Sequence, residues 1–544
     1  MKKALFAVIF LISLASCVSG QSGQPLRVEI PVHTGTNPFN YIPFGENGIC
    51  MFYPTSNDAG KDSINWSFVM LDKNFKELWR KLIPMHEDVS YLKGFSRNNV
   101  IYLLFHDTQR NTDGNIHVFF IYPSKHLITE HRSSIPDKAD VADFEIWNEY
   151  ALIGYNQRKG KPGMLGFSLM SGEKRNFDFT VSDDALLLDI AADTIYKDIY
   201  AVYKIQPSSS RNMLMVNVYD GSSALRRSVA LKNAQEKRIL NSAQFILTGN
   251  GTGFVAGTYG PGTRNRRNYD YYNDYYNYYY YNSFYRRQAN YDANKDNTPV
   301  SDGYFTASLS SSDTGIMKYY NFIDFSNTQK YLNDPEAMRS RKKAEKNNKG
   351  EAGDGSGNGH DYSLDYRLLI HPVIASDGKY LFLSEAYSPE YHTMTQMVYD
   401  YYGRAMPSSY SVFDGFRYTN AFLAAFDSSG TMAWNNGMEM RDILTTYLNR
   451  KMNLYNDSSS IVLFYNANAK IAYKTIQGSS IIENTSFTPL APKKVTDQFI
   501  GEYLSAIEPW YGDYFLASGY ESLRSNNMEG NKRNIFYLCK MAFK

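Results

Sequence analysis

The chain has 544 residues, of which 57 are basic and 55 are acidic, and its formal net charge is +2. We expect Lys2 and Lys3 to be removed with a leader, which leaves 55 basic residues against 55 acidic ones. A neutral mature chain has no general attraction for nucleic acid or anionic lipid, so we expect no nucleic-acid partner. No later stretch approaches the roughly 18 consecutive apolar residues of a transmembrane helix, so we expect membrane attachment only through a lipid anchor or a partner.

The N-terminal residues have the pattern of an export signal. Lys2 and Lys3 precede Ala4–Leu14, an apolar run of eleven residues, whereas a bilayer core needs about 20. The next residues, Leu14-Ala15-Ser16-Cys17, resemble the bacterial lipobox, which implies cleavage before Cys17 and a lipid on its thiol. The alternative is ordinary cleavage after Gly20, which would leave a periplasmic or secreted protein. We interpret residues 1–20 as a lipoprotein-type signal peptide, and we expect an exported, outer-membrane-associated protein facing the periplasm or the cell surface.

Three cysteines are few for an exported chain of this length. With Cys17 assigned to the lipid, Cys50 and Cys539 remain, one near each end of the mature chain. They are either two buried free thiols or a bridge that would close a ring. We favour free thiols, because a bridge requires Cα atoms within about 7 Å of one another.

Two segments share one pattern of strand, turn and strand. In Phe68–Trp79 and in Phe422–Trp434 an apolar strand ends at an aspartate, Asp72 or Asp427, and a tryptophan follows seven residues later. The aspartate side chain can accept a hydrogen bond from the backbone two residues on, which favours a tight turn. The pattern resembles the outer hairpin of a blade in quinoprotein-like propellers, a family that includes outer-membrane assembly lipoproteins. The resemblance covers these two hairpins and implies a β-propeller.

The rest of the mature chain, residues 21–544, keeps this rhythm without the tryptophan. Short aromatic and β-branched runs bounded by Gly, Asn and Asp are typical of strands, and helical periodicity is nearly absent. We therefore predict an all-β fold, a seven- or eight-bladed β-propeller, with strand Arg27–Val32 beside the last blade. Two propellers or a tandem of β-sandwiches are the alternative. The predicted units are 27–84, 89–135, 139–180, 184–232, 238–325, 364–442, 447–490 and 497–544.

Long insertions interrupt the later units. With strands A to D counted outward in each blade, the B–C and D–A connections emerge on the same face. The predicted register places Gly260–Asp302, Ser388–Tyr418 and Glu521–Asn534 between strands B and C, and the basic and Gly-rich linker 326–363 between D and A. We therefore expect the long loops on one face of the propeller. Repeat proteins often use such a face for binding, although scattered insertions would indicate neutral drift.

The insertion 260–302 is rich in tyrosine, with nine tyrosines in the thirteen positions from Tyr269 to Tyr281. Tyrosine and arginine are favoured in binding loops, because tyrosine covers area at low entropic cost and arginine donates to several acceptors. Contact with a protein, stacking of sugars, stacking of single-stranded nucleic acid and a loop with no ligand are the four interpretations. A second aromatic loop is expected near Tyr391. The residues predicted to contact a partner are Arg266, Arg267, Tyr271, Tyr272, Tyr275, Tyr276, Arg286, Arg287, Tyr391 and Tyr401.

No catalytic motif is found. The sequence has no nucleophile elbow, phosphate-binding loop or zinc-protease motif, and we predict no catalytic residue, metal or cofactor. Asp292–Asp296 begins like a calcium loop but lacks the glycine and the glutamate of that motif. Glu385, Glu390 and Asp365 are the carboxylates that a glycosidase on the loop face would use.

Together these features predict a non-catalytic, envelope-anchored propeller that binds an envelope or surface protein through its loop face. One alternative is a carbohydrate-binding protein or glycosidase that uses the same aromatic face. Another is a surface protein that self-associates through its tyrosine-rich loop.

Overall fold

The structure is a computed structural model of the chain. It describes residues 25–542 except for 33–38, 61, 108–114, 137–138, 158–160, 178–184, 206–212, 232–237, 250–251, 262–299, 310–316, 326–365, 400–401, 447, 458–459, 495 and 526–531. The predicted signal peptide, the tyrosine-rich insertion and the basic linker therefore lie outside the described residues. In the described part of the chain, strands are joined by turns and by three short 3₁₀ helices, η1 (Gly45–Asn47), η2 (Pro123–Lys125) and η4 (Phe322–Asp324).

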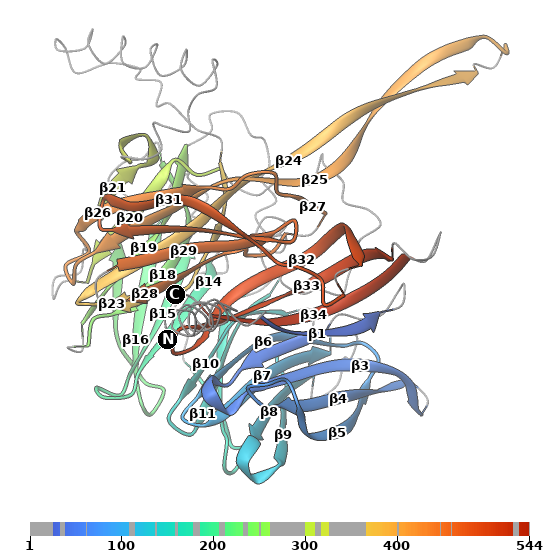
Figure 1. The fold of residues 1–544 in the computed structure, drawn as a ribbon. Coiled ribbons are helices and arrows are strands. Elements are labelled where there is room, and N and C mark those ends of the chain that lie inside the picture. The colour runs from blue at the N-terminus through green and yellow to red at the C-terminus, as the bar shows by residue number, and fades with distance from the viewer. Residues whose placement is uncertain are drawn as a thin grey trace, which may run out of the picture.

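The strands form eight antiparallel sheets, numbered here in chain order (Figure 1). Sheet 1 is β2 (Asn40–Pro43), β3 (Ile49–Gly60), β4 (Ser63–Leu71) and β5 (Glu77–His86). Sheet 2 is β6 (Val89–Arg97), β7 (Val100–Asp107), β8 (Ile116–Tyr122) and β9 (Leu127–Ser133). Sheet 3 is β10 (Ala139–Trp147), β11 (Tyr150–Gln157), β12 (Gly163–Ser168) and β13 (Lys174–Asn176). Sheet 4 is β14 (Ala185–Asp193), β15 (Asp198–Ile205), β16 (Met213–Asp220) and β17 (Leu225–Leu231).

The later sheets follow the same plan. Sheet 5 is β18 (Arg238–Leu247), β19 (Gly253–Pro261), β20 (Gly303–Ser308) and β21 (Met317–Asn321). Sheet 6 is β22 (Arg367–Ile370), β23 (Ile374–Ser376), β24 (Lys379–Tyr399), β25 (Ala405–Phe426), β26 (Met432–Glu439) and β27 (Leu444–Thr445). Sheet 7 is β28 (Met452–Asp457), β29 (Ser460–Ala467), β30 (Lys470–Gln477) and β31 (Ser480–Pro489). Sheet 8 is β32 (Asp497–Tyr511), β33 (Tyr514–Ser525), β34 (Lys532–Ala542) and β1 (Leu26–Val32).

Aromatic contacts or clusters of apolar side chains join each sheet to the next and the last sheet to the first. Phe52 of sheet 1 meets Phe105 of sheet 2 with ring centroids 6.0 Å apart, and Phe464 of sheet 7 meets Phe515 of sheet 8 at 4.6 Å. Phe75 of sheet 1 stacks on Trp510 of sheet 8 at 5.7 Å. Apolar clusters link the remaining neighbours in the same way. The sheets thus form a closed ring, and the fold is the all-β propeller that the sequence predicts.

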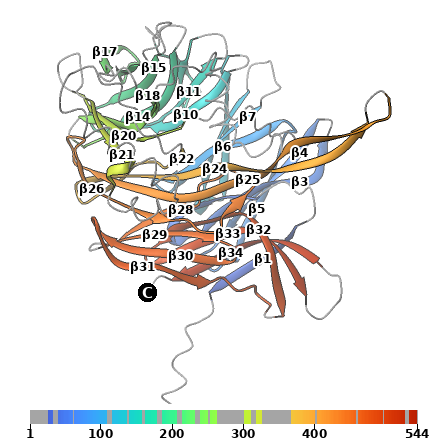
Figure 2. The same ribbon diagram turned by 90° about the horizontal axis from the view of Figure 1, so that it is seen from above.

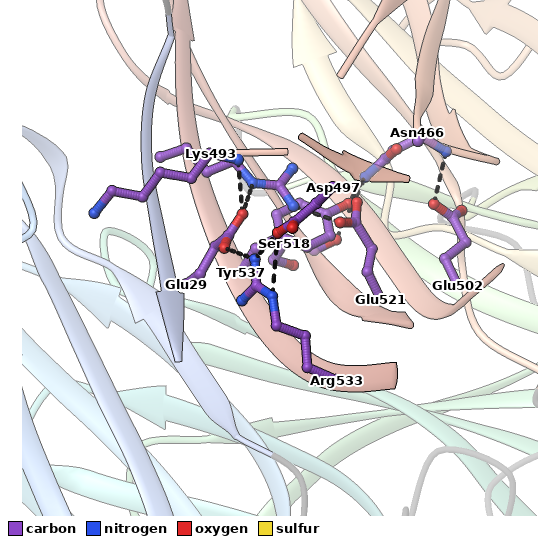
Figure 3. A network of polar contacts seen from close by, with 11 residues as sticks. Glu29, Asn466, Lys493, Asp497, Glu502, Ser518, Glu521, Arg533 and Tyr537 are labelled. Carbon is purple, nitrogen blue, oxygen red and sulfur yellow. Dashed lines mark hydrogen bonds and ion pairs between the residues drawn. The ribbon is translucent and has the colours of Figure 1, made fainter. Parts of the chain in front are cut away.

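The N-terminal strand completes the last sheet, as predicted. Strand β1 pairs with β34 along its whole length, from Leu26 opposite Lys540 to Val32 opposite Asn534. Figure 3 shows the polar network behind this pairing, in which Glu29 accepts from Arg533 at 2.8 Å and from the backbone N–H of Lys493 at 2.8 Å. Arg533 also binds Asp497. Strand β1 is the outer strand of sheet 8, and the other three strands of this sheet come from the opposite end of the chain. The pairing of β1 with β34 therefore closes the ring.

The outer hairpins carry the predicted aspartate turns. The Asp72 carboxylate accepts from the backbone N–H groups of Asn74 and Lys76, each at 2.8 Å, and Asp427 accepts from Ser429 and Thr431, each at 2.9 Å. Each tryptophan reaches the corresponding turn of the next sheet. The indole of Trp79 donates to the Pro123 carbonyl at 3.3 Å, and Trp434 lies against Gly478. The hairpins therefore also serve as contacts between sheets.

The chain order also fixes which end of the sheets carries the insertions. Residues 262–302 lie between β19 and β20, and residues 526–531 lie between β33 and β34, so both are B–C connections. Residues 326–365 follow η4 and precede β22, which makes them a D–A connection. In sheet 8, Leu26 lies at the end of the sheet opposite to the B–C connection, because it pairs with Lys540 near the end of β34.

Cys50 and Cys539 are both buried and unbridged, as predicted. Burial raises the pKa of each thiol to about 12, so neither carries a reactive thiolate at neutral pH. Among the helices of the described residues, none has the length and apolar character needed to span a bilayer.

Candidate functional site: a projecting hairpin arm

Strands β24 and β25 extend far beyond the rest of their sheet. They pair with one another from Tyr380 opposite Phe426 out to Tyr399 opposite Ala405. Their neighbours β22 and β26 stop early, since β22 pairs only up to Tyr387 and β26 only from Asn420. We call residues 388–415 the arm. Figures 1 and 2 show the arm projecting from the body of the molecule as a free two-stranded ribbon.

The sequence predicted a loop for Ser388–Tyr418, and this prediction is wrong, although the position between strands B and C is confirmed. Threonine, valine, tyrosine and methionine alternate along 391–399, and such residues favour extended backbone on a pleated surface. The reversal between the two strands includes Gly403, whose φ of 74° lies in the left-handed region that glycine tolerates. Pro389, Gly403 and Pro407 each lie where a hairpin accepts them.

Between its base and its tip the arm carries no charge, whereas the tip itself contains Asp400 and Arg404. Residues 393–399 and 405–413 contain only Thr, Met, Gln, Val, Tyr, Ala, Pro, Ser and Phe. The exposed large side chains there are Met394, Met397, Val398, Tyr399, Met406 and Tyr410. Met397 is 64% exposed and Tyr399 is 73% exposed. Exposed apolar patches of this kind are typical of surfaces that contact another molecule.

Apolar side chains lie on both faces of the arm. Because side chains alternate along a strand, Met397 and Tyr399 share one face with Pro407 and Ala405, their cross-strand partners. Val398 and Met406 are paired on the opposite face, and there the Tyr410 hydroxyl lies 3.9 Å from the Met394 sulfur. A molecule that covers one face alone would leave the other apolar face in water.

The base of the arm is fixed by aromatic packing and by pairing with β27. Phe413 packs edge-on against Phe416 with ring centroids 5.0 Å apart, and Tyr387 packs on Phe416 at 5.6 Å. Phe416 and Arg417 pair with β27. A Cβ atom on Gly415 would lie 2.8 Å from the carbonyl oxygen of Thr445, so only glycine lets β25 pass this strand without a shift. The arm is therefore held at its base.

Two ion pairs stand on the arm next to its base. His392 lies 2.6 Å from Asp414, and the Arg417 guanidinium binds Glu390 through two contacts, one of them 2.9 Å. Arg417 holds the pKa of Glu390 below its usual value. These groups are solvent-exposed, so each pair adds little stability. They do mark the boundary at which the charge-free part of the arm begins.

Two of the three carboxylates that a glycosidase would use, Glu385 and Glu390, have partners within the protein. Glu385 is completely buried; it accepts from His371 at 2.6 Å and from the backbone N–H groups of Lys451 and Met452 at 2.8 and 2.9 Å. Glu390 is paired with Arg417, and Asp365 lies outside the described residues. The two described carboxylates thus have structural partners, which counts against the glycosidase alternative.

A serine and a lysine that the sequence did not single out lie side by side. Lys451 donates to the Ser505 hydroxyl at 3.0 Å and to its carbonyl at 3.2 Å, and burial lowers the pKa of the lysine. Such a pair can activate a serine nucleophile. Ser505, however, is completely buried and its hydroxyl donates to the Asn466 carbonyl at 3.0 Å. A substrate has no access to Ser505, so we assign the pair to the packing of sheet 7 on sheet 8.

One carboxylate on the innermost strand β32 titrates near neutrality. Burial raises the pKa of Glu508 to about 7, and its hydrogen-bond partner is the hydroxyl of Tyr41, which also bonds Ser518 at 2.8 Å. Within the described ranges, no group of three or more His, Cys, Asp or Glu side chains is placed to hold a metal ion. Among these residues no metal centre is therefore found around Glu508.

The predicted contact residues divide into two groups. Tyr391 lies at the base of the arm, half-buried, with its ring 5.5 Å from that of Phe413. The others lie outside the described residues: Arg266, Arg267, Tyr271, Tyr272, Tyr275, Tyr276, Arg286, Arg287 and Tyr401. The sequence-based prediction did not include Met394, Met397, Val398 and Met406, although the uncharged runs 393–399 and 405–413 were a signal that could have found them.

No family model and no curated protein matches the sequence. Solved structures with a similar fold include a eukaryotic initiation factor, with 8% identity over 95% of this chain and 98% of that chain and a TM-score of 0.38. The polysaccharide lyase Uly1 has 9% identity over 83% of this chain and 89% of its own, with a TM-score of 0.35. A prolyl endopeptidase has 8% identity, a coverage of 84% and 50%, and a TM-score of 0.35, so the chain spans half of its length. Likenesses at this level concern the fold alone.

Proposed function

We propose that the protein is a non-catalytic binding protein of the cell envelope that contacts another protein through the arm. The observation that carries this proposal is the exposed, charge-free strip on both faces of 393–399 and 405–413. Methionine and tyrosine suit such a contact, because methionine adapts to irregular surfaces and tyrosine covers area at low entropic cost.

A protein is a better occupant than a lipid bilayer. Within the described ranges, each strand of the arm pairs beyond the base only with the other, so the outer edges have backbone N–H and C=O groups without a described strand partner. In hydrocarbon each unsatisfied backbone group costs several kcal/mol, and an open hairpin is therefore unsuited to the bilayer core. A protein groove can supply both apolar side chains and hydrogen-bond partners.

The proposal includes the anchor and the second binding element that the sequence suggests. Cys17 would carry the lipid, and the tyrosine-rich insertion 260–302 would extend the contact, with Tyr271, Tyr272, Arg266 and Arg286 among its side chains. The arm and the insertion 260–302 each connect strands B and C, in adjacent sheets. The two connections therefore leave the propeller at the same end.

The test is co-purification from gently solubilised envelopes, with the stoichiometry of every retained protein measured. A charge on the arm, Met406→Asp, should remove a partner that the natural chain retains near one-to-one. Ile482→Asp is the matched control, because Ile482 is equally exposed, at 58%, but lies on β31, the outer strand of sheet 7. Equal retention by both variants would refute the arm as the contact element.

A further inference from the structure

The two edges of the arm differ. On β25, Pro407 removes a backbone donor, and a register shift near Asp414 interrupts the pairing. Natural proteins protect exposed edges with such features. On β24, residues 391–399 contain no proline, glycine, lysine or bulge. The β24 edge is therefore left open to strand pairing while the β25 edge is blunted.

The sequence of the open edge is suited to antiparallel pairing with a second copy of the same strand. It reads Tyr-His-Thr-Met-Thr-Gln-Met-Val-Tyr from 391 to 399. If two such strands pair antiparallel about Thr395, Tyr391 stands opposite Tyr399, Thr393 opposite Met397, and Thr395 opposite Thr395 of the other copy. Aromatic pairs and threonine pairs at directly opposite positions are favourable, and this register places no like charges opposite one another.

The shape of the arm permits this pairing. The twelve residues 388–399 extend for about 40 Å at roughly 3.3 Å per residue. The arm projects from the body of the molecule (Figure 2), so two-fold pairing would place the two propellers at opposite ends of the paired strands. An isolated two-stranded hairpin is only marginally stable in water, whereas a four-stranded sheet is stable.

From the open edge, the self-compatible register and the blunted opposite edge, we infer that a second copy of this chain pairs with the first through β24, to form a four-stranded sheet about a two-fold axis. Pro407 stops further addition, so the assembly closes at two copies instead of growing into a fibre. The edge contact is smaller than the roughly 800 Å² per partner of a standard interface, so the dimer is weak and depends on concentration. The inference concerns the edge of the same arm whose faces the proposed function assigns to another protein.

Cysteine trapping in the full chain tests the inference. Thr395→Cys should form a disulfide-linked dimer on mild oxidation, since opposite Cα atoms in an antiparallel pair are about 4.5–5.5 Å apart, within disulfide range. Ser409→Cys is the matched control, because Ser409 is exposed and directly opposite Thr395, hydrogen-bonded to it at 2.8 Å, but on β25. We expect about tenfold more linked dimer from Thr395→Cys than from Ser409→Cys. Because Cys50 and Cys539 are buried, the unsubstituted chain gives the background level of disulfide-linked dimer.

The register provides a second readout. Thr393→Cys alone should not link to itself, whereas a mixture of Thr393→Cys and Met397→Cys chains should link. Thr395→Lys should lower the sedimentation-derived association constant at least about tenfold by placing two ammonium groups opposite one another, and Ser409→Lys should leave it unchanged. Equal trapping at 395 and 409, or no dimer at any concentration, would overturn the inference. Arm-dependent co-purification that persists in that case would leave the proposed function standing.

Discussion

Arg27 in the first strand and Glu521 in β33 form a buried ion pair although 494 positions separate them in the sequence. The side chains are 4% and 0% exposed. The Arg27 guanidinium also lies over the Tyr537 ring, 4.3 Å from its centroid, and donates to Glu29 at 3.1 Å. The pair joins the two ends of the described chain, so the closure of the ring depends on two charges that cannot reach water.

Removal of one charge should therefore weaken the whole ring. We expect Glu521→Leu to lower the free energy of unfolding by about 3–5 kcal/mol, because the buried guanidinium loses its fully buried partner and keeps the contact with Glu29. The double variant Arg27→Met with Glu521→Leu should recover a large part of this loss. Urea unfolding measures both. Glu439→Gln, which breaks the exposed pair with Arg441, is the control and should cost less than about 1 kcal/mol.

His106 should make the fold sensitive to mild acid. Burial lowers the pKa of His106 to about 4, whereas the unfolded chain protonates this residue near its ordinary value of 6.5. Between pH 6.5 and 4 the unfolded state binds more protons, so stability falls as the pH falls through this window. His106→Gln should reduce the slope of stability against pH by up to about 1.4 kcal/mol per pH unit there. An unchanged slope in urea titrations at pH 4.5–6.5 would contradict this assignment.

Glu508 should have the opposite effect on the pH dependence of stability. Burial raises the pKa of Glu508 to about 7 from an ordinary value of 4.5, so the folded state binds more protons between pH 4.5 and 7. Stability from this group is present in mild acid and is lost as the pH rises through 7. Glu508→Gln should raise the Tm at pH 8 and change it little at pH 4.5. A lower Tm at pH 8 than that of the natural chain would show that the carboxylate is stabilising there.

The contribution of each aspartate turn to stability should be measurable on its own. Asp72→Ala and Asp427→Ala each remove two hydrogen bonds to backbone N–H groups, and each should cost about 1 kcal/mol in a solvent-exposed turn. Asp220 makes the same contacts, with Ser222 at 2.8 Å and Ala224 at 3.1 Å, so Asp220→Ala should cost about as much. Thermal unfolding of the three variants checks these values. An unchanged Tm for Asp220→Ala would show that the turn at Asp220 is not equivalent to the turns at Asp72 and Asp427.

Asp220 also shows what the sequence could and could not reveal about the repeat. Two hairpins were recognisable because a tryptophan follows the aspartate, at Trp79 and Trp434. The hairpin at Asp220 has the same turn but no tryptophan, and arginine stands at the matching position, since Arg227 pairs with Val218 as Trp79 pairs with Met70. The succession of short strands along the chain was nonetheless predictable, because short apolar runs between turns depend on local sequence alone.

The buried charges and the arm were harder to predict. Nothing local links Arg27 to Glu521, since their contact depends on the closure of the ring. Residues 388–418 were interpreted as an insertion with an aromatic loop near Tyr391, and the β-favouring composition of 391–399 was not weighed. Proline is compatible with the outer edge of a hairpin, where its missing donor faces no neighbouring strand. Tyr391 was selected for its ring, but the more exposed side chains lie further out and include methionines, Val398 and Tyr399.

The most direct test of the arm as a protein contact is site-specific photo-crosslinking in intact cells from Met406. Met406 is 54% exposed and lies on β25, away from the open edge of β24. The account predicts one adduct containing a second, different protein near one-to-one, and none from the equally exposed control position Ile482. No adduct from Met406, or the same set of adducts from both positions, would contradict it.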